Sequence, residues 1–462
     1  MFIGRERELK VLNDLYNRGD FQCVIIWGRR RVGKTTLINE FIKNKACIYF
    51  TGIESTMKEN LENFSRSISG YLGFDASIAP VYDSFKNALE SINDLAIQKQ
   101  IVLVLDEYPY LAKSYNAISS ILQQMIDHKF KDNTKLFIII CGSSMSFMER
   151  QVLGYQSPLF GRRTAQIKVK PFDFFESLGF CKSFTNEEKA VLYGITGGVP
   201  QYMSFIDEAC SLKENIIKNF LSVNGYLYEE PTNLLKQELR EPGTYNAIIR
   251  AIATGSSKSS EISTKVGLES SVTAGYIERL TELGIVKKET PIGSNNTRKT
   301  IYSIEDNMFR FWYTFVSGNL NTIQRNMYEV AWKSVEKNIS NFMGKVFEQI
   351  CLDYLWKDYE KLPVMFQYVG RWWGTNPVLK REEEIDILGY NDEGQALLCE
   401  CKWRNELVDI DVIRTLQDRS KLLPYKEYHF YVFAKRGFTD RAIVMANKND
   451  NIKLITFDEM MN

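Results

Sequence analysis

Histidine is scarce in this sequence of 462 residues, which contains only His128 and His429. Two histidines argue against a histidine-rich zinc site and against a Ser-His-Asp triad. The eight cysteines are scattered without the paired spacing of a zinc site, so we expect them to be small buried hydrophobic residues. A metal bound by this chain should therefore have carboxylate ligands, which favour Mg²⁺ or Mn²⁺.

Long hydrophobic runs are also missing, because apolar runs such as Leu136–Cys141 have the length of a strand. The first residues lack the pattern of a secretion signal, so we expect a cytoplasmic protein without membrane contact. The formal net charge of +1 excludes a surface that is basic throughout, and any nucleic-acid surface must be local. The length predicts two to four domains.

Strand-like and helix-like stretches alternate over residues 1 to about 170. This alternation predicts a parallel sheet with helices on both faces. The expected strands are Val24–Trp27, Ala46–Phe50, Ile101–Leu105, Leu136–Cys141 and Ala165–Val169.

The segment from Gly28 to Thr35 reads Gly-Arg-Arg-Arg-Val-Gly-Lys-Thr and matches the phosphate-loop pattern G-x-x-x-x-G-K-[ST]. It lies between an apolar strand and the amphipathic stretch Thr36–Ile42, which is the context that the pattern requires. Glycines let backbone N–H groups close around phosphate oxygens, and the following helix N-terminus adds partial positive charge. Lys34 should reach the β and γ phosphates, while the Thr35 hydroxyl should bind Mg²⁺.

Two acidic residues, Asp106 and Glu107, end the apolar strand Ile101–Leu105. The aspartate can hold the Mg²⁺ shell and the glutamate can act as a general base on the attacking water. A chance glycine loop with a solvated acidic turn is the alternative, and the joint occurrence of both motifs argues against it. The expected nucleotide-binding residues are Gly28, Arg31, Val32, Gly33, Lys34, Thr35, Thr36, Asp106 and Ser143.

Three further residues are weaker candidates for this site. Ser143 follows the next strand and could sense the γ phosphate, although a simple turn explains it equally well. Arg162 or Arg163 could stabilise transition-state charge as an arginine finger, and a structural arginine is the alternative.

Residues 171 to about 304 lack the alternation of strand-like and helix-like stretches seen before them. A helical region contains Glu187–Thr196 and Gln201–Ala209, separated by a Gly-Gly-Val-Pro turn. Three short helical stretches follow: Tyr245–Ala253, Ser259–Val266 and Ser271–Leu283. Two strand-like runs, Ile285–Glu289 and Arg298–Ile304, then surround a Gly-Ser-Asn-Asn tip. Helix, helix, helix and hairpin is the order of a winged helix-turn-helix.

The third helix of this region is net acidic, with Glu278, Arg279 and Glu282, which disfavours contact with DNA phosphates. The wing is more basic, because it carries Lys287, Lys288, Arg298 and Lys299 against Glu289. Contact of the wing with the DNA backbone and a packing role between domains both stay open, and sequence-specific readout is not supported.

The N-terminal half resembles the archaeal-type ATPase family, a relative of AAA+ and STAND ATPases. The matching pieces, spread over residues 2 to about 203, are Phe2–Glu6 with Glu8-Leu9, Gly28–Thr35, Leu105–Glu107, Gly142–Ser144, Ser157–Arg163 and Gly197–Pro200. The resemblance implies an ATPase core with a helical lid and a winged helix, and it suggests that Phe2 to Arg5 lie near the adenine. Members often carry a C-terminal domain that resembles the PD-(D/E)XK nucleases.

A second motif lies in the C-terminal part of the chain. Glu400 and Lys402 end an apolar strand and project from the same face, since they are two residues apart. Asp386 lies on the preceding strand of the hairpin. An odd-numbered loop centred on Glu393 would put Asp386 opposite Glu400, whereas an even loop would turn them apart.

If they converge, Asp386 and Glu400 can hold a divalent metal and Lys402 can position a water for phosphodiester hydrolysis. Glu348, on an upstream helical stretch, could add a carboxylate. This segment resembles the restriction-endonuclease-like signature D…E-x-K, although Asp386 lacks a preceding proline. An ordinary charged hairpin is the alternative.

Together these features predict a multi-domain α/β protein. The expected parts are a P-loop ATPase domain (1–170), a helical lid (171–235), a winged helix (236–310), a helical connector (311–340) and a restriction-endonuclease-like domain (341–462). The first hypothesis is an ATPase that uses ATP and Mg²⁺ and is coupled to a DNA-cleaving domain, with DNA bound by the C-terminal domain and the wing. A nucleotide switch with an inactive nuclease-like domain that binds DNA or protein, and a transcription regulator, are the alternatives. The oligomeric state stays open, with a homo-oligomer as one option.

Overall fold

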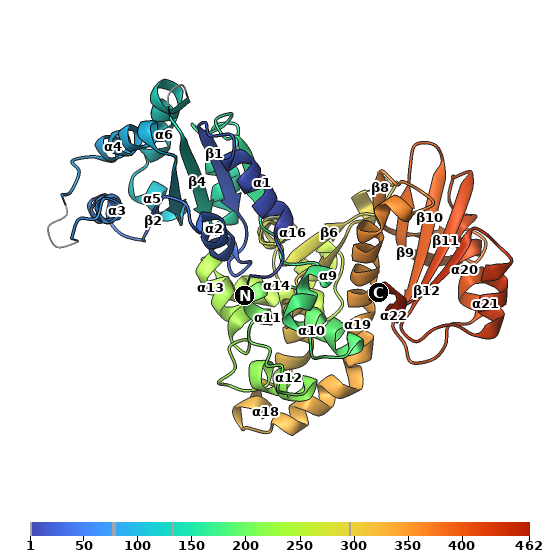
Figure 1. Ribbon diagram of the computed structural model, residues 1–462. Helices are drawn as coiled ribbons and strands as arrows, with labels where there is room; N and C mark the ends of the chain where they lie inside the picture. The colour runs from blue at the N-terminus through green and yellow to red at the C-terminus, as the bar shows by residue number, and fades with distance from the viewer. Residues whose placement is uncertain (1, 76–79, 132–133, 295–296) are drawn as a thin grey trace. The chain divides into compact units, whose positions relative to one another are not determined.

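A computed structural model describes residues 2–75, 80–131, 134–294 and 297–462. The chain forms two compact units, one of Met1–Phe172 with Val199–Gln201 and one of Asp173–Gly198 with Tyr202–Asn462. Each unit is described by itself below (Figure 1). In the described ranges, no helix is both long and apolar enough to cross a membrane.

The first unit is built on a five-stranded sheet in the order β2-β3-β4-β1-β5, in which all neighbouring strands are parallel. The sequence prediction of five parallel strands is confirmed, with ends that differ by two residues at most. The strands are β1 (Gln22–Trp27), β2 (Cys47–Thr51), β3 (Ile101–Asp106), β4 (Leu136–Gly142) and β5 (Ala165–Lys168).

Helices cover both faces of this sheet, as Figure 1 shows. Alternate residues of a strand point to opposite faces, so Val24 packs with the core under α1 and α2, while Ile25 packs with the core under α3 to α6. The helices are α1 (Glu6–Tyr16), α2 (Lys34–Ile42), α3 (Met57–Tyr71), α4 (Phe85–Gln98), α5 (Tyr108–Ser114), α6 (Ile118–Met125) and α8 (Met145–Phe147).

The second unit begins with short helices: α9 (Phe174–Ser177), α10 (Asn186–Thr196), α12 (Leu212–Phe220) and α13 (Glu230–Glu238). The helix expected over Gln201–Ala209 is much shorter, because α11 covers only Pro200–Met203. The Asn215 side chain explains this difference. It accepts a hydrogen bond from the Asp207 N–H and donates to the Asp207 and Cys210 carbonyls, which holds this segment as a loop before α12.

Three helices and a hairpin follow: α14 (Pro242–Ala253), α15 (Ser259–Val266), α16 (Ser270–Glu282), β6 (Val286–Glu289) and β7 (Ile301–Ile304). This is the order that the sequence predicted. The second strand starts later than expected, since Thr297–Lys299 forms a 3-10 turn. Asn295 and Asn296 of the expected tip lie outside the described residues.

A long helix, α19 (Tyr328–Lys357), follows α17 (Asn307–Phe311) and α18 (Leu320–Gln324). The domain boundary expected at residue 341 falls inside this continuous helix. The helix contacts both α10 and β10, so it joins the helical region to the C-terminal sheet within one unit.

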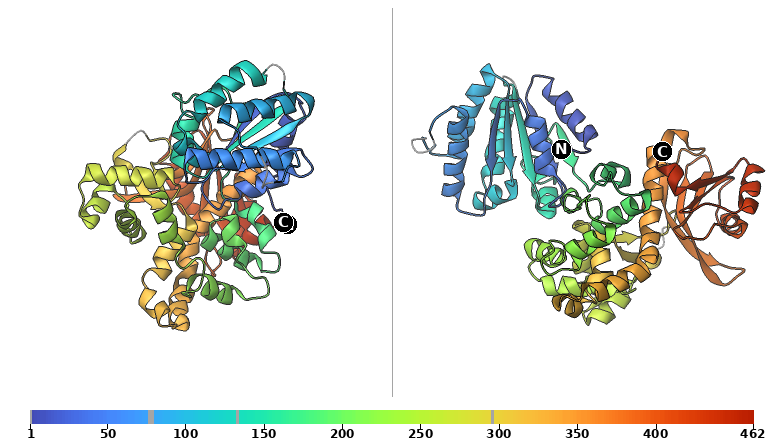
Figure 2. Two further views of the ribbon diagram at one scale, coloured as in Figure 1. Left: turned by 90° about the vertical axis from the view of Figure 1, so that its left-hand side faces the viewer. Right: turned by 60° about the horizontal axis from the view of Figure 1, so that its bottom comes forward.

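The C-terminal sheet is mixed, with the order β12-β11-β10-β9-β8. Its first three strands pair antiparallel as β8-β9-β10, and β10, β11 and β12 pair parallel. Figures 1 and 2 show α19 on one side of this sheet and α20 and α21 on the other. The elements are β8 (Tyr368–Asn376), β9 (Arg381–Tyr390), β10 (Gln395–Lys402), α20 (Ile410–Ser420), β11 (Glu427–Ala434), α21 (Asp440–Asn447), β12 (Ile452–Thr456) and α22 (Phe457–Met460).

Candidate functional sites

The carboxyl ends of the parallel strands bring the predicted phosphate-binding segments to one edge of the first sheet. Gly28 follows β1, Asp106 ends β3 and Ser143 follows β4. Because β4 lies between β1 and β3, these three segments are neighbours although they are far apart in the sequence. Ligands of open α/β sheets bind at this edge.

The loop after β1 requires its glycines. A Cβ atom on Gly28 would lie 2.2 Å from the carbonyl oxygen of Val169, and Gly33 has a φ of 88° in the left-handed region. Arg31 also has a positive φ, of 73°. Helix α2 begins at Lys34, directly after Gly33. Thr35 and Thr36 are exposed in its first turn, and Val32 is buried before it. The loop and the helix N-terminus together form an anion-binding geometry.

Lys34 is held over this loop. Its Nζ donates hydrogen bonds to the carbonyl oxygens of Gly28 at 2.8 Å and Arg29 at 3.0 Å. Burial lowers the pKa of Lys34, and the nearby carboxylates of Glu107 and Asp106 oppose that shift. A phosphate group bound in the loop would compensate the buried charge of this lysine.

The acidic strand end is organised by two side chains from neighbouring strands. Tyr49 of β2 donates a hydrogen bond to Asp106 at 2.7 Å. Ser143 donates to both carboxylate oxygens of Glu107, each at 3.0 Å. Glu107 itself has a φ of 47°, which is uncommon for a residue with a side chain and typical of functional sites. The structure thus places Ser143 on the expected general base.

Sequence reasoning did not identify Tyr49 as part of this site. Its signal was the one hydroxyl group in the expected strand Ala46–Phe50, and the pairing of Thr51 with Asp106 in the β2–β3 register was needed to locate it.

Two further contacts brace the phosphate loop. The Arg5 guanidinium donates a hydrogen bond to the Val32 carbonyl at 3.1 Å and lies 4.2 Å from the centre of the Phe172 ring. Pro200 lies against the loop from another side, because a Cβ on Gly33 would be 3.7 Å from its ring. Pro200 therefore contributes to the loop's surroundings.

Arg162 and Arg163 lie far from the phosphate loop of their own chain. They precede β5, so they are at the amino ends of strands whose carboxyl ends carry the loop. A six-residue strand spans roughly 20 Å. Arg162 binds Asp127 through its Nε and Nη2 at 2.7 to 3.0 Å, and this contact lowers the pKa of Asp127. Arg163 stacks over Phe160 at 5.5 Å.

The residues at the carboxyl edge fit ATP and Mg²⁺ by their chemistry. The loop supplies N–H donors and the Lys34 ammonium for phosphate oxygens, while Thr35 and Asp106 supply the hydroxyl and carboxylate oxygens that Mg²⁺ prefers. Glu107 adds a carboxylate of defined orientation.

The hairpin of β9 and β10 has the register that an odd-numbered loop requires. Leu398 pairs with Leu388 and Cys399 with Ile387, so Asp386 and Glu400 are the next residues of that register. Gly394 has a φ of 88° at the loop's end. The structure therefore decides between the two alternatives that the sequence left open, in favour of the odd-numbered loop.

Asp386 lies close to the other expected acidic residues. Its Oδ2 accepts a hydrogen bond from the Cys401 N–H at 2.8 Å. Burial, followed by the neighbouring charges of Glu400 and Glu348, raises the pKa of Asp386 to about 8. These three carboxylates therefore share one region of low solvent access.

Glu400 is held by two cations. Lys402 Nζ donates to its Oε1 at 2.6 Å, and Arg419 Nη1 donates to its Oε2 at 2.8 Å. Arg419 also donates to the buried Glu383 at 3.0 Å. In the part of the chain that the structure describes, no three Asp, Glu, His or Cys side chains are gathered as a metal-ligand set.

Sequence analysis also missed Arg419. Its signal was a charge on the apolar face of α20, because it is three residues after Leu416 and seven after Val412, both of which are buried.

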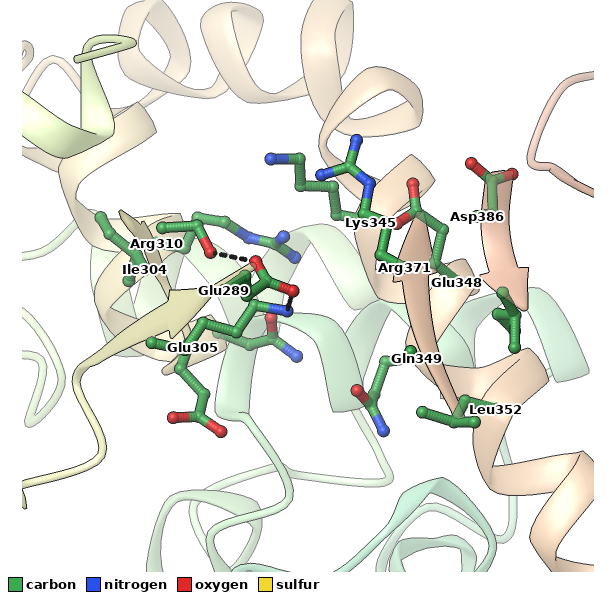
Figure 3. A pocket seen from close by; sticks show the side chains of 15 residues that line it. Glu289, Ile304, Glu305, Arg310, Lys345, Glu348, Gln349, Leu352, Arg371 and Asp386 are labelled. Atoms are coloured by element: carbon green, nitrogen blue, oxygen red, sulfur yellow. Dashed lines mark hydrogen bonds and ion pairs between the residues drawn. The ribbon is translucent and has the colours of Figure 1, made fainter. Parts of the chain in front are cut away.

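Glu348, on α19, lines a cavity of about 180 Å³ together with Asp386 (Figure 3). Burial raises the pKa of Glu348, although the nearby Arg371 opposes this shift. The β6–β7 hairpin, α17 and β8 contribute the other walls. The loop of that hairpin is attached to β8, since the Ile292 N–H donates to the Arg371 carbonyl at 3.0 Å. The β6–β7 hairpin thus packs on the C-terminal sheet.

The parallel sheet, the glycine loop leading into α2 and the acidic end of β3 define a P-loop ATPase. Residues 2–206 match the family described as the ATPase domain predominantly from Archaea, and residues 312–418 match a family of archaeal and bacterial proteins of unknown function. This chain belongs to that archaeal ATPase family.

Two relatives and one solved structure are similar to this chain. An uncharacterized protein of Methanocaldococcus jannaschii is 32% identical over 438 residues, which cover 93% of this chain and 94% of the relative. An uncharacterized ATP-binding protein of the same organism is 47% identical over 45 residues, or 10% of this chain and 76% of that protein. A Walker-type ATPase of Pyrococcus abyssi shares the fold, with a TM-score of 0.52 at 20% identity over 68% of this chain and 96% of that one.

Proposed function

We propose that this protein hydrolyses ATP at the phosphate loop and that its C-terminal domain binds DNA and cleaves it with a divalent metal. Mg²⁺ would supply charge neutralisation and an activated water at each site. The observation that carries the proposal for the C-terminal domain is the position of Asp386, adjacent to Glu400 across the hairpin and in one cavity with Glu348.

At the ATPase site, Lys34 would bind the β and γ phosphates, and Thr35 and Asp106 would hold the Mg²⁺. Glu107 would take the proton of the attacking water while Ser143 keeps its carboxylate oriented. Lys34→Ala should abolish ATP binding. Glu107→Gln should still bind ATP and lose hydrolysis by at least about 100-fold, since general-base catalysis contributes that much.

At the C-terminal site, Asp386 and Glu400 would hold the metal, Glu348 would add a carboxylate and Lys402 would position the water. Metal binding at Glu400 would require its Oε1 or Oε2 to exchange a cationic partner for the ion. The sheet order and the flanking helices α19 and α20 agree with the expected restriction-endonuclease-like domain, and the α14–α16 helices with β6 and β7 agree with a winged helix.

A second candidate function is a nucleotide-dependent switch whose C-terminal domain binds DNA or protein without cleavage. The observation that favours it is the pairing of both Glu400 oxygens with Lys402 and Arg419, which satisfies the carboxylate without a metal.

A cleavage assay separates the two candidates. Full-length wild type and Asp386→Asn would be incubated with linear, circular and single-stranded DNA, with Mg²⁺ or Mn²⁺, and with or without ATP. Cleavage that Asp386→Asn loses supports the nuclease. Intact ATP hydrolysis without cleavage of any DNA by wild type would contradict it and favour the switch.

A further inference from the structure

Three cationic side chains from three different elements meet at the cavity beside Asp386. They are Arg310 of α17, Lys345 of α19 and Arg371 of β8. Figure 3 shows the three side chains around the same pocket as Glu348 and Asp386. After burial, the charges of Arg371 and Arg310 are the largest causes that lower the pKa of Lys345, so the three groups repel one another at short range.

The Arg310 guanidinium has unsatisfied donors in the described part of the chain. Its Nε and Nη2 are buried and have no hydrogen-bond partner among the described residues. Its guanidinium lies 4.6 Å from the centre of the Phe342 ring, which holds its plane in place. Buried donors without partners are costly, and a guanidinium fork matches the oxygens of a phosphate group.

Arg371 also has an unsatisfied buried donor. Its Nη2 donates to Glu384 at 2.6 Å, while its Nε is also buried without a partner among the described residues. Lys345 is exposed, so the cavity is reachable from solvent at this point.

Carboxylates also line this cavity, namely Glu289, Glu305, Glu348 and Asp386. Glu289 is occupied by Lys287 at 2.8 Å and by the Ser303 hydroxyl at 3.0 Å. An anion that accepts from Arg310 and Arg371 would both satisfy the unused donors and relieve the repulsion.

We propose that Arg310, Lys345 and Arg371 form a pocket for a backbone phosphate of DNA, which positions the strand for the site at Asp386. This inference rests on the proposed binding of DNA by the C-terminal domain, and it holds whether or not that domain cleaves. It also assigns a role to the packing of the β6–β7 hairpin on β8, because the hairpin closes one wall of the pocket.

The test is the binding of a short fluorescein-labelled DNA duplex by the full chain, measured by anisotropy over a series of salt concentrations in EDTA, with and without a non-hydrolysable ATP analogue. Arg310→Gln and Lys345→Gln should each weaken binding by about tenfold and reduce the slope of log affinity against log salt by about 1, because each removes one phosphate contact. Lys337→Gln, an exposed lysine of the same helix, is the matched control and should leave both quantities unchanged.

Arg310→Lys is the control for a folding defect, because it keeps the positive charge but loses the paired N–H donors of the guanidinium. It should keep the salt slope and bind with intermediate affinity, and thermal melting of every variant would verify the fold. Wild-type affinity and slope in Arg310→Gln and Lys345→Gln would overturn the proposal. A wild type that binds no DNA would instead contradict the proposed function on which the inference rests.

A parallel arm measures the thermal stabilisation of the same proteins by inorganic phosphate alone. Stabilisation that Arg310→Gln loses, together with weakened DNA binding, supports a phosphate pocket used by DNA. Lost stabilisation with unchanged DNA binding would assign the pocket to a free phosphate ligand and overturn the DNA assignment.

Discussion

At the scale of single residues, the contact between Ser143 and Glu107 shows how a strand neighbour can control a catalytic group. Glu107 follows β3 in a left-handed conformation, and both of its carboxylate oxygens accept from the hydroxyl of Ser143, which follows β4. A carboxylate that is oriented in this way loses little freedom when it must accept a proton.

Ser143→Ala should therefore lower kcat for ATP hydrolysis by about tenfold, which corresponds to about 1.4 kcal/mol in the barrier. The affinity for ATP should stay unchanged, because Ser143 contacts the glutamate rather than the loop. Ser144→Ala, at the neighbouring position, is the control. Steady-state kinetics and equilibrium binding of ATP test this, and equal kcat values for the two variants would refute it.

In the C-terminal domain, the single side chain of Arg419 pairs with two buried carboxylates. Glu383 and Glu400 have side chains only 5% and 9% exposed. Removing one partner from a buried ion pair leaves an uncompensated charge.

Arg419→Ala should lower the free energy of unfolding of this domain by about 3 kcal/mol. The exposed Arg414 on the same helix provides the control, and Arg414→Ala should change it by less than about 0.5 kcal/mol. Urea unfolding measures both values. A small effect of Arg419→Ala would mean that Lys402 and solvent suffice to neutralise these carboxylates.

At the scale of elements, the half-buried carboxylate of Asp353 connects α19 to α9 of the helical region. Asp353 accepts from the N–H of Phe174 in α9 at 3.2 Å and from Gln349 at 2.8 Å. Burial raises the pKa of Asp353 from 3.8 to about 6. The folded state therefore binds this proton more tightly than the unfolded state does.

The sign of the pH effect follows from that shift. The contribution of Asp353 to stability is complete below about pH 4 and is lost as the pH rises through about 6. Asp353→Asn removes this titration, so the melting temperature of wild type relative to the variant should rise as the pH is lowered from about 7 to about 5.

Thermal melts over this pH range test the prediction. Glu336→Gln, which changes an exposed carboxylate of the same helix, should show no such dependence. A constant difference between wild type and Asp353→Asn at all pH values would contradict the assignment.

Elements also differ in how well the sequence predicted them. The β1 to β5 strands and the α14 to α16 helices were predictable because their apolar periodicity is strong. The end of α11 was not, because a single side chain, Asn215, holds the following segment as a loop. The continuity of α19 was missed since its first half looked like a connector by composition.

At the scale of the whole molecule, the proposed function couples a nucleotide site in one unit to a DNA site in the other. Lys34→Ala should remove any effect of ATP on the rate of DNA cleavage while the cleavage seen without ATP is retained. The reason is that Lys34 lies in the first unit and Asp386 in the second, so the mutation changes nucleotide binding alone.

Cleavage by wild type, Lys34→Ala and the exposed control Lys58→Ala, each with and without ATP, measures this coupling. If ATP changes the rate equally in Lys34→Ala and wild type, the coupling does not depend on the phosphate loop.

The sequence by itself determined the phosphate loop, the acidic strand end and the five parallel strands. These features depend on local spacing and periodicity, which are visible along the chain. Only the tertiary structure decided which side chains meet: Tyr49 on Asp106, Arg419 on Glu400, and Arg310 with Lys345 and Arg371. It also placed Arg162 away from the loop of its own chain. Such contacts join residues from elements far apart in sequence, and strand order and helix packing set them.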